Sequence, residues 1–185
     1  MRMRNSLAIL LVAGGMLLGA NLDTLGQEFD IPEPIRTEHE ELHARIEAAM
    51  QAGGRTGKAA KAVSDALTPH FEKEEKYALP QLGVTSRLVG VTPAPKEPKL
   101  SRQEREDLIT RTDRFREELP KMLEEHKAIG AAVEKLQRAA EAEKKPEQIA
   151  LAEQIRQHAK TEEQILYPAA LLIGEYARLQ AGSAP

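Results

Sequence analysis

Two stretches of this chain share one pattern, HFEKEEKYALP at residues 70–80 and HAKTEEQILYP at residues 158–168. In both, a His is followed four residues later by two consecutive Glu and ten residues later by a Pro. Upstream of these stretches, Glu38-His39 and Glu125-His126 form a second repeated pair, offset by 87 residues where the longer motif is offset by 88. The chain therefore consists of two related helix pairs, each with a His first and the longer motif second.

The spacing within the longer motif places its His and its first Glu on one face of a helix, one turn apart. The same period continues the apolar positions that precede each motif, such as Leu67 before His70 and Ile155 before His158. His39 and His126 each lead apolar residues three and seven positions later. Six side chains are thus predicted to enter one helical core: His39, His70, Glu74, His126, His158 and Glu162.

A cation is the partner that such a buried set requires. Burying two carboxylates and four imidazoles without a partner would cost many kcal/mol. A lone His on an apolar stripe is more often a satisfied core residue, and a single His-x-x-x-Glu is more often a surface pair. The repetition favours ligands, and carboxylates can bridge two ions, so we predict a dinuclear site. Glu75 and Glu163, about 100° from the stripe, are expected behind the ligands or in solvent, and Pro80 and Pro168 are expected to shape helix ends.

The remaining sequence predicts four helices and no strand. Capping boxes at residues 37–40 and 101–104 predict helices over 37–52 and 101–143, and Gly53-Gly54 ends the first of them. A second helix is expected over 56–79, and a last one from Pro146, bent or broken at Pro168, with a helical tail to residue 180. The prediction is an all-α, up-down-up-down four-helix bundle over residues 35–180, with a Pro-rich connection at 81–100.

The first residues have a different composition from the rest. Residues 1–20, MRMRNSLAILLVAGGMLLGA, combine two Arg, an uncharged apolar run and small residues, which is the layout of an export signal. We expect residues 21–34 to form a tether and the protein to be periplasmic or secreted. The alternative is that residues 1–20 remain as an inner-membrane anchor, with the domain outside the cytoplasm.

Composition excludes several kinds of site. The chain has 185 residues, a formal net charge of −3 and no Cys, so disulfides, zinc–thiolate sites, iron–sulfur clusters and thiol nucleophiles are excluded. Mild acidity, six aromatic residues and no Trp give no basis for nucleic-acid binding. The five His and the many Glu are what remains for metal or acid–base chemistry.

With these residues the sequence resembles the hemerythrin family, specifically the bacterial hemerythrin-like, or HHE cation-binding, domain. The resemblance covers about residues 35–172 and rests on His39, His70-x-x-x-Glu74, His126 and His158-x-x-x-Glu162, with the Glu and Pro that follow. Ferritin-like carboxylate proteins use Glu-x-x-His instead, a pattern that occurs here once, at Glu40 to His43.

The resemblance implies a non-heme di-iron centre, in which Glu74 and Glu162 bridge two iron ions beside a third, oxo or hydroxo, bridge. Oxygen-carrying hemerythrins have a fifth His at the position of Gly130, and we expect His43 on the first helix to serve instead. The first iron would then take His39, His43 and His70, and the second His126 and His158, with an open position for dioxygen. If His43 is a partly exposed helix residue, then Tyr77, Tyr167 or water would contribute.

Three functions follow as hypotheses. The first is reversible binding of dioxygen, or of a related small ligand, by a protein that is not an enzyme. The second is an oxidoreductase, a di-iron peroxidase or a nitric-oxide-scavenging enzyme, which open positions on both irons would favour. The third is a metal-binding or metal-buffering domain. No residue in the sequence demands catalysis, and the oligomeric state is left open.

Overall fold

The computed structural model describes residues 29–90 and 100–182, and within them all regular structure is helical, with no strand. Residues 1–20, the first part of the expected tether and residues 91–99 lie outside the described ranges. No helix in the described ranges is long and apolar enough to span a bilayer. The elements are α1 (Glu33–Gln51), α2 (Gly54–Tyr77), a 3₁₀ turn (Pro80–Val84), α3 (Thr85–Leu88), α4 (Arg102–Ala142), α5 (Pro146–Thr161), a π-helical turn (Glu162–Leu166) and α6 (Tyr167–Gly182).

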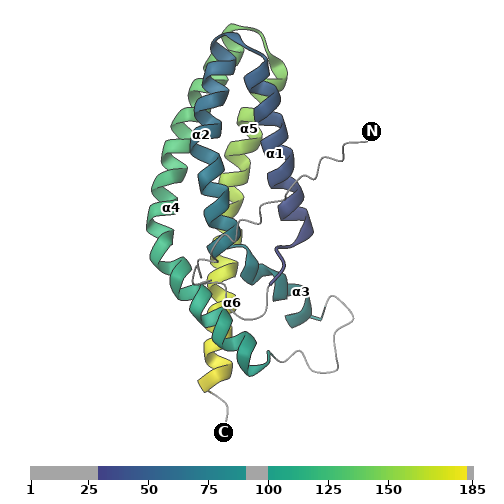
Figure 1. Cartoon of the computed structure of the whole chain (residues 1–185), viewed down its shortest axis with the longest axis vertical. Coiled ribbons are helices and arrows are strands. Elements are labelled where there is room, and N and C mark those ends of the chain that lie inside the picture. The colour runs from purple at the N-terminus through teal and green to yellow at the C-terminus, as the bar shows by residue number, and fades with distance from the viewer. Residues whose placement is uncertain (1–28, 91–99, 183–185) are drawn as a thin grey trace, which may run out of the picture.

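Four long helices, α1, α2, α4 and α5, run side by side with alternating direction (Figure 1). Helix α6 extends beyond α5 and packs against the first half of α4 (Figure 1). The predicted all-α bundle is therefore confirmed for the described residues, with an extension at the end where α3 and the beginning of α4 lie.

Helix α1 begins earlier than the sequence predicts. It starts at Glu33, with Pro34 in its first turn, where the missing N–H of a proline is harmless. Thr37 therefore lies inside the helix, and its hydroxyl donates a hydrogen bond to Glu33 instead of capping an amide. Phe29 is buried in the core, so residues 29–34 belong to the bundle rather than to the expected tether. The capping box at Ser101, in contrast, is present with both of its hydrogen bonds.

The turn between α1 and α2 is tied to the end of α4. Gly53 and Gly54 have φ angles of 64° and 65°, which residues with a Cβ rarely adopt, so α2 follows α1 directly. The carboxylate of Glu143 accepts hydrogen bonds from the N–H of Arg55 at 2.8 Å and from the hydroxyl of Thr56 at 2.7 Å. These bonds, with that from the Thr56 hydroxyl foremost, lower the pKa of Glu143 to about 2.

The two copies of the repeated motif diverge at their prolines. After the first copy, α2 ends at Tyr77 and Pro80 begins a 3₁₀ turn. After the second copy the chain stays helical through the π turn at Glu162–Leu166, so of the two alternatives predicted at Pro168, a bend or a break, the break does not occur. A proline lacks an N–H and crowds the carbonyl four residues back, and the wider π turn relieves both problems. The strong helix formers at 169–172 then continue the helix, whereas Gly83 follows Pro80.

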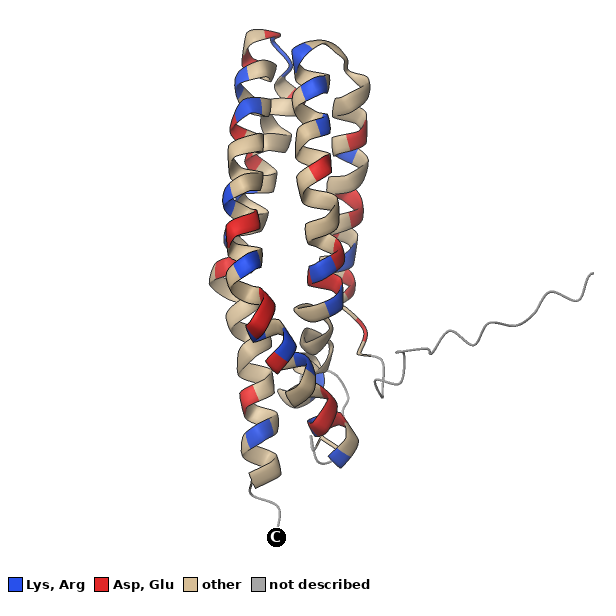
Figure 2. Cartoon of the chain, turned by 60° about the vertical axis from the view of Figure 1, so that its left-hand side comes forward, with Lys and Arg blue, Asp and Glu red and all other residues tan. Residues whose placement is uncertain are grey.

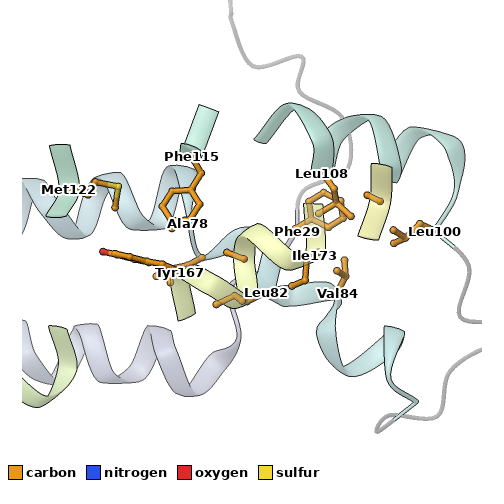
Figure 3. Close-up of a cluster of buried hydrophobic side chains, with 13 residues drawn as sticks. Phe29, Ala78, Leu82, Val84, Leu100, Leu108, Phe115, Met122, Tyr167 and Ile173 are labelled. Carbon is orange, nitrogen blue, oxygen red and sulfur yellow. The ribbon is translucent and has the colours of Figure 1, made fainter. Parts of the chain in front are cut away.

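A layer of buried polar residues separates two apolar clusters. The lower cluster, which lies toward the α6 end of the molecule in Figure 1 and is drawn in Figure 3, joins the first half of α4 to α6, the 3₁₀ turn and Phe29. The upper cluster fills the space between α1, α2, α5 and the second half of α4. Along every long helix the polar positions lie between these clusters, so His126 follows Met122 and precedes Ile129.

Positively and negatively charged residues are mixed along the helices, and neither sign predominates. Lys and Arg alternate with Asp and Glu along the helices of the bundle (Figure 2). Many of these residues form ion pairs one turn apart, such as Lys61 with Asp65. Alternating signs of this kind are typical of a solvated helical surface.

Candidate metal centre

Each of the four long helices places a His in the polar layer, α2 adds Glu74, and the π turn that follows α5 adds Glu162. All six side chains come from residues with at most 7% of their surface exposed, and Glu74 is at 0%. These residues are the six that the repeat predicts to enter the core: His39, His70, Glu74, His126, His158 and Glu162.

The six side chains form two overlapping sets of potential ligands, each with donor atoms within 4.8 Å of one another. The α1/α5 group contains His39, His158 and both Glu residues. The α2/α4 group contains His70, His126 and the same two Glu residues. Each group therefore offers two imidazole nitrogens and two carboxylate oxygens, a donor set that can hold a metal ion.

Glu74 and Glu162 each turn one oxygen to each group. Oε2 of Glu74 lies 3.7 Å from Nε2 of His39, while its Oε1 lies 3.3 Å from Nε2 of His70. Oε1 of Glu162 lies 2.8 Å from Nε2 of His158, and its Oε2 lies 3.3 Å from Nε2 of His126. Two carboxylates that are divided in this way can serve two neighbouring cations.

The α1/α5 group consists of atoms without hydrogen bonds. Nε2 of His39, Nε2 of His158, Oε2 of Glu74 and Oε1 of Glu162 are buried and have no hydrogen-bond partner among the described residues. The 2.8 Å approach of His158 to Glu162 is close but lacks hydrogen-bond geometry. Unsatisfied buried polar atoms are costly, and these four converge, so a cation fits the set.

The electrostatics of the centre reflect two carboxylates buried face to face. Burial, reinforced by the charge of Glu162, raises the pKa of Glu74. Burial would also raise the pKa of Glu162, but the imidazoles of His126, His158 and His39 outweigh it and lower that pKa. Burial opposes the charge of His158, yet the adjacent Glu162 carboxylate prevails and raises the pKa of His158 to about 9. Protons therefore balance the charges until a cation replaces them.

A carboxylate faces the outer nitrogen of every His in the two groups. Nδ1 of His39 lies 3.1 Å from Glu75, and Nδ1 of His126 lies 2.8 Å from Glu163. Such a carboxylate accepts the Nδ1–H and leaves the Nε2 lone pair free for a metal. The other two pairs are His70 with Glu125 at 2.9 Å and His158 with Glu38 at 3.4 Å.

These outer carboxylates account for the repeated Glu dipeptides. Of the two places expected for Glu75 and Glu163, behind the ligand positions or in solvent, the structure shows the first, although both side chains remain partly exposed. Glu38 and Glu125 have no predicted role, although their repetition beside His39 and His126 is a signal that could have identified them. In each dipeptide one residue faces the centre, and its neighbour holds a His of another helix.

Two aromatic side chains line the centre on different sides. Phe71 stacks on His39, with ring centroids 3.9 Å apart and planes within 7°. The hydroxyl of Tyr167 lies 3.4 Å from Nε2 of His70 and 3.3 Å from Nε2 of His126, and it donates a short hydrogen bond to Glu74. Phe71 is not among the predicted site residues, because it is apolar and directly follows the predicted ligand His70.

The positions of His43 and His39 differ from those that the expected assignment of ligands requires. His43 is exposed, belongs to neither group, and contacts the edge of Phe71 with ring centroids 5.1 Å apart. His39 is grouped with His158, not with His70, so the side chains are not divided between the two hairpins, α1–α2 and α4–α5, as the expected iron positions require. The sequence could not distinguish these pairings because α1 contacts both α2 and α5.

A pocket approaches the centre beside His126. Its volume is about 230 Å³, and its walls include Gly130, Val133, Ile155 and Glu163. A Cβ placed on Gly130 would have no neighbour within 4 Å among the described residues. Gly130 therefore leaves this part of the pocket open.

Comparison with known proteins agrees with the geometry. The sequence model of the hemerythrin HHE cation-binding domain family matches residues 30–170 of this chain. No curated protein and no solved structure gives a significant match. The matched range contains all four His of the two groups and both shared Glu. The chain belongs to the hemerythrin HHE cation-binding domain family.

Proposed function

We propose that this protein is a non-heme di-iron protein that binds dioxygen or a related small ligand in the core of the bundle. The observation that carries the proposal is the pair of overlapping groups, because both carboxylates turn one oxygen to each group. A single cation would leave one pair of imidazoles without a partner, whereas two cations use every inward-facing donor.

The donor chemistry is suited to iron. Imidazole and carboxylate ligands accommodate iron in both its ferrous and ferric states, and the chain contains no thiolate to favour a softer metal. Two iron ions supply two electrons in total, which is the number needed to reduce dioxygen to the level of peroxide. The pocket beside Gly130, whose lining combines Ile129 and Ile155 with charged residues, gives a small ligand an approach to the centre.

A second function, consumption of peroxide or nitric oxide, is favoured by one observation. Neither group contains a third His, because His43 is exposed and Gly130 has no side chain. Each cation then has open positions for water and substrate, which suits turnover better than reversible carriage. The pocket beside His126 serves this reaction equally well.

The decisive experiment combines iron analysis with spectroscopy. We expect two irons per chain after anaerobic reconstitution, and a visible absorption change on addition of air. Reversal of this change under argon supports ligand binding, whereas irreversible bleaching together with steady consumption of peroxide and a reductant supports the enzyme. A chain that takes up no more than one iron contradicts the di-iron proposal.

A control variant separates a specific centre from weak metal buffering. His70→Ala removes a buried ligand, while Glu72→Gln changes an exposed side chain on the same helix. We expect His70→Ala to lose iron and Glu72→Gln to retain two irons per chain. Equal iron content in both variants would show that the metal binds elsewhere.

A further inference from the structure

The two groups of the centre are not equivalent, although the repeat that builds them is nearly symmetric. The α2/α4 group has an additional oxygen above its imidazoles, the hydroxyl of Tyr167. The α1/α5 group has the ring of Phe71 against His39, which offers no donor atom. The repeat does not predict this difference, since Tyr167 corresponds to Leu79 in the first copy.

The position of the hydroxyl matches that of a ligand. Metal–nitrogen and metal–oxygen bonds of about 2.1 Å place neighbouring donors roughly 3 Å apart around one ion. The Tyr167 oxygen lies 3.4 Å from Nε2 of His70 and 3.3 Å from Nε2 of His126. The same spacing of 3.3 Å separates those nitrogens from the nearest oxygens of Glu74 and Glu162.

The rest of the fold holds Tyr167 in this orientation. Its side chain is buried at the edge of the lower cluster, with its hydroxyl pointing to the left in Figure 3, and its ring lies 5.3 Å from that of Phe115. The other face of the ring stacks on His126 with an angle of 16° between the planes. Tyr167 is also the first residue of α6, directly after the π turn, so the turn sets the direction in which the ring points.

We propose that the phenol oxygen of Tyr167 is a fifth protein donor to the cation of the α2/α4 group, which makes the two cation positions unequal. This inference rests on the proposed function, because it requires a cation in that group. When the oxygen binds a ferric ion, its proton leaves to solvent and Glu74 loses the hydrogen bond that it otherwise accepts from Tyr167.

The test uses the colour of a ferric ion bound to a tyrosine oxygen. The chain has three Tyr, so Tyr77→Phe combined with Tyr176→Phe leaves Tyr167 alone. We expect the ferric full-length protein and this double variant to show the visible charge-transfer absorption and the resonance Raman bands of an iron-bound phenolate. Tyr167→Phe, which keeps the ring and its packing, should lose both signals.

A second readout is the stepwise affinity for metal. Anaerobic titration of the full-length chain with Fe(II) should resolve two steps. In Tyr167→Phe we expect one step to weaken about tenfold and the other to stay unchanged, whereas the double variant should match the parent. Circular dichroism of the metal-free variants checks that all of them are folded.

The outcomes separate the two proposals. If the parent protein binds two irons but shows no phenolate bands, and Tyr167→Phe leaves both affinities unchanged, the Tyr167 assignment is wrong and the di-iron proposal stands. If the parent binds fewer than two irons, the proposed function itself fails. Should Tyr167→Phe fail to fold, the Raman spectrum of the double variant still decides, because only Tyr167 can produce its phenolate bands.

Discussion

Each His of the centre turns its Nε2 toward the other inward-facing donors and its Nδ1 toward a carboxylate on its outer side. The four outer carboxylates belong to Glu dipeptide or Glu-His pairs, and each reaches a His on another helix. Because these carboxylates are partly exposed, their charges keep contact with water and lose little solvation energy. The His side chains that they orient are almost completely buried. At this scale the important property is orientation, because a ring that could rotate would not keep its Nε2 aimed at the centre.

Glu75→Gln and Glu163→Gln test this orientation. Each change keeps the size of the side chain but removes the charge behind His39 or His126. We expect each to weaken metal binding about tenfold, with no loss of fold. Competition with a chelator of known affinity measures the change, and the exposed Glu72→Gln serves as the control. Affinities equal to the parent would mean that these carboxylates do not orient the ligands.

His43→Ala and His39→Ala test the ligand set itself. The two residues are one turn apart on α1, but only His39 is buried in the centre. We expect His43→Ala to keep two metal ions per chain and His39→Ala to lose at least one. Elemental analysis after desalting gives the number. Loss of metal from His43→Ala would show that this side chain moves inward when a cation binds.

At the scale of elements, irregular helix geometry decides where side chains point. The π turn at Glu162–Leu166 carries the chain past Pro168 and aims Tyr167 at the α2/α4 group. The tight contact of α4 with α6 depends on Gly174, because a Cβ there would lie 2.0 Å from Oγ1 of the buried Thr112. At the opposite end of the bundle, Glu143 directly follows α4, and its carboxylate accepts hydrogen bonds from the beginning of α2.

Gly174→Ala and Gly130→Ala form a matched pair, since both glycines lie inside helices. The first change forces a methyl group onto Thr112 and should lower the free energy of unfolding by roughly 1–3 kcal/mol. The second places a methyl group in open space and should raise it by about 1 kcal/mol, through helix propensity. Urea denaturation of the metal-free proteins measures both values. A neutral Gly174→Ala would indicate that α4 and α6 can separate at little cost.

Glu143→Gln tests the tie between α4 and the turn of the first hairpin. The pKa of Glu143 falls to about 2 in the folded chain, from 4.5 ordinarily, so its charge stabilises the fold above about pH 4.5. That contribution disappears as the pH falls toward 2. We expect the variant to have a Tm a few degrees lower at neutral pH, and this difference to shrink on acidification.

Thermal unfolding followed at several pH values provides the comparison for Glu143→Gln. Glu47→Gln on the exposed side of α1 is the control and should match the parent at every pH. A Tm difference that stays constant below pH 4.5 would contradict the assignment to the carboxylate charge.

At the scale of the whole molecule, each group of potential ligands joins the two halves of the repeat. The α1/α5 group takes its His from the first and last long helices, and the α2/α4 group takes its His from the middle two. Neither hairpin alone contains both His of a group. Metal binding should therefore be linked to the packing of the two hairpins against each other.

Two double variants test this arrangement with the same number of ligands removed. His39→Ala combined with His158→Ala removes both His of the α1/α5 group and leaves the α2/α4 group complete, so we expect one tightly bound ion. His39→Ala with His70→Ala takes one His from each group, so we expect both ions to bind weakly. Equilibrium dialysis counts the ions, and the opposite result would support one cation per hairpin.

The sequence predicts more of the centre's composition than of its arrangement. The repeat identifies all six buried side chains of the centre because a 3.6-residue period relates each of them to the apolar stripe of its own helix. The start of α1, the π turn and the outer roles of Glu38 and Glu125 were not predicted. These features depend on contacts with other helices, or on small local energies such as that of a proline in the first turn.

What the sequence by itself determined is the all-helical fold and the six polar side chains that enter its core. Each of these follows from local periodicity, which a single helix expresses before it meets a neighbour. Only the tertiary structure decided that His39 pairs with His158, that His43 stays outside, and that Tyr167 faces one group alone. The physical reason is that local periodicity orients side chains around one axis, whereas the packing of four helices decides which of them meet.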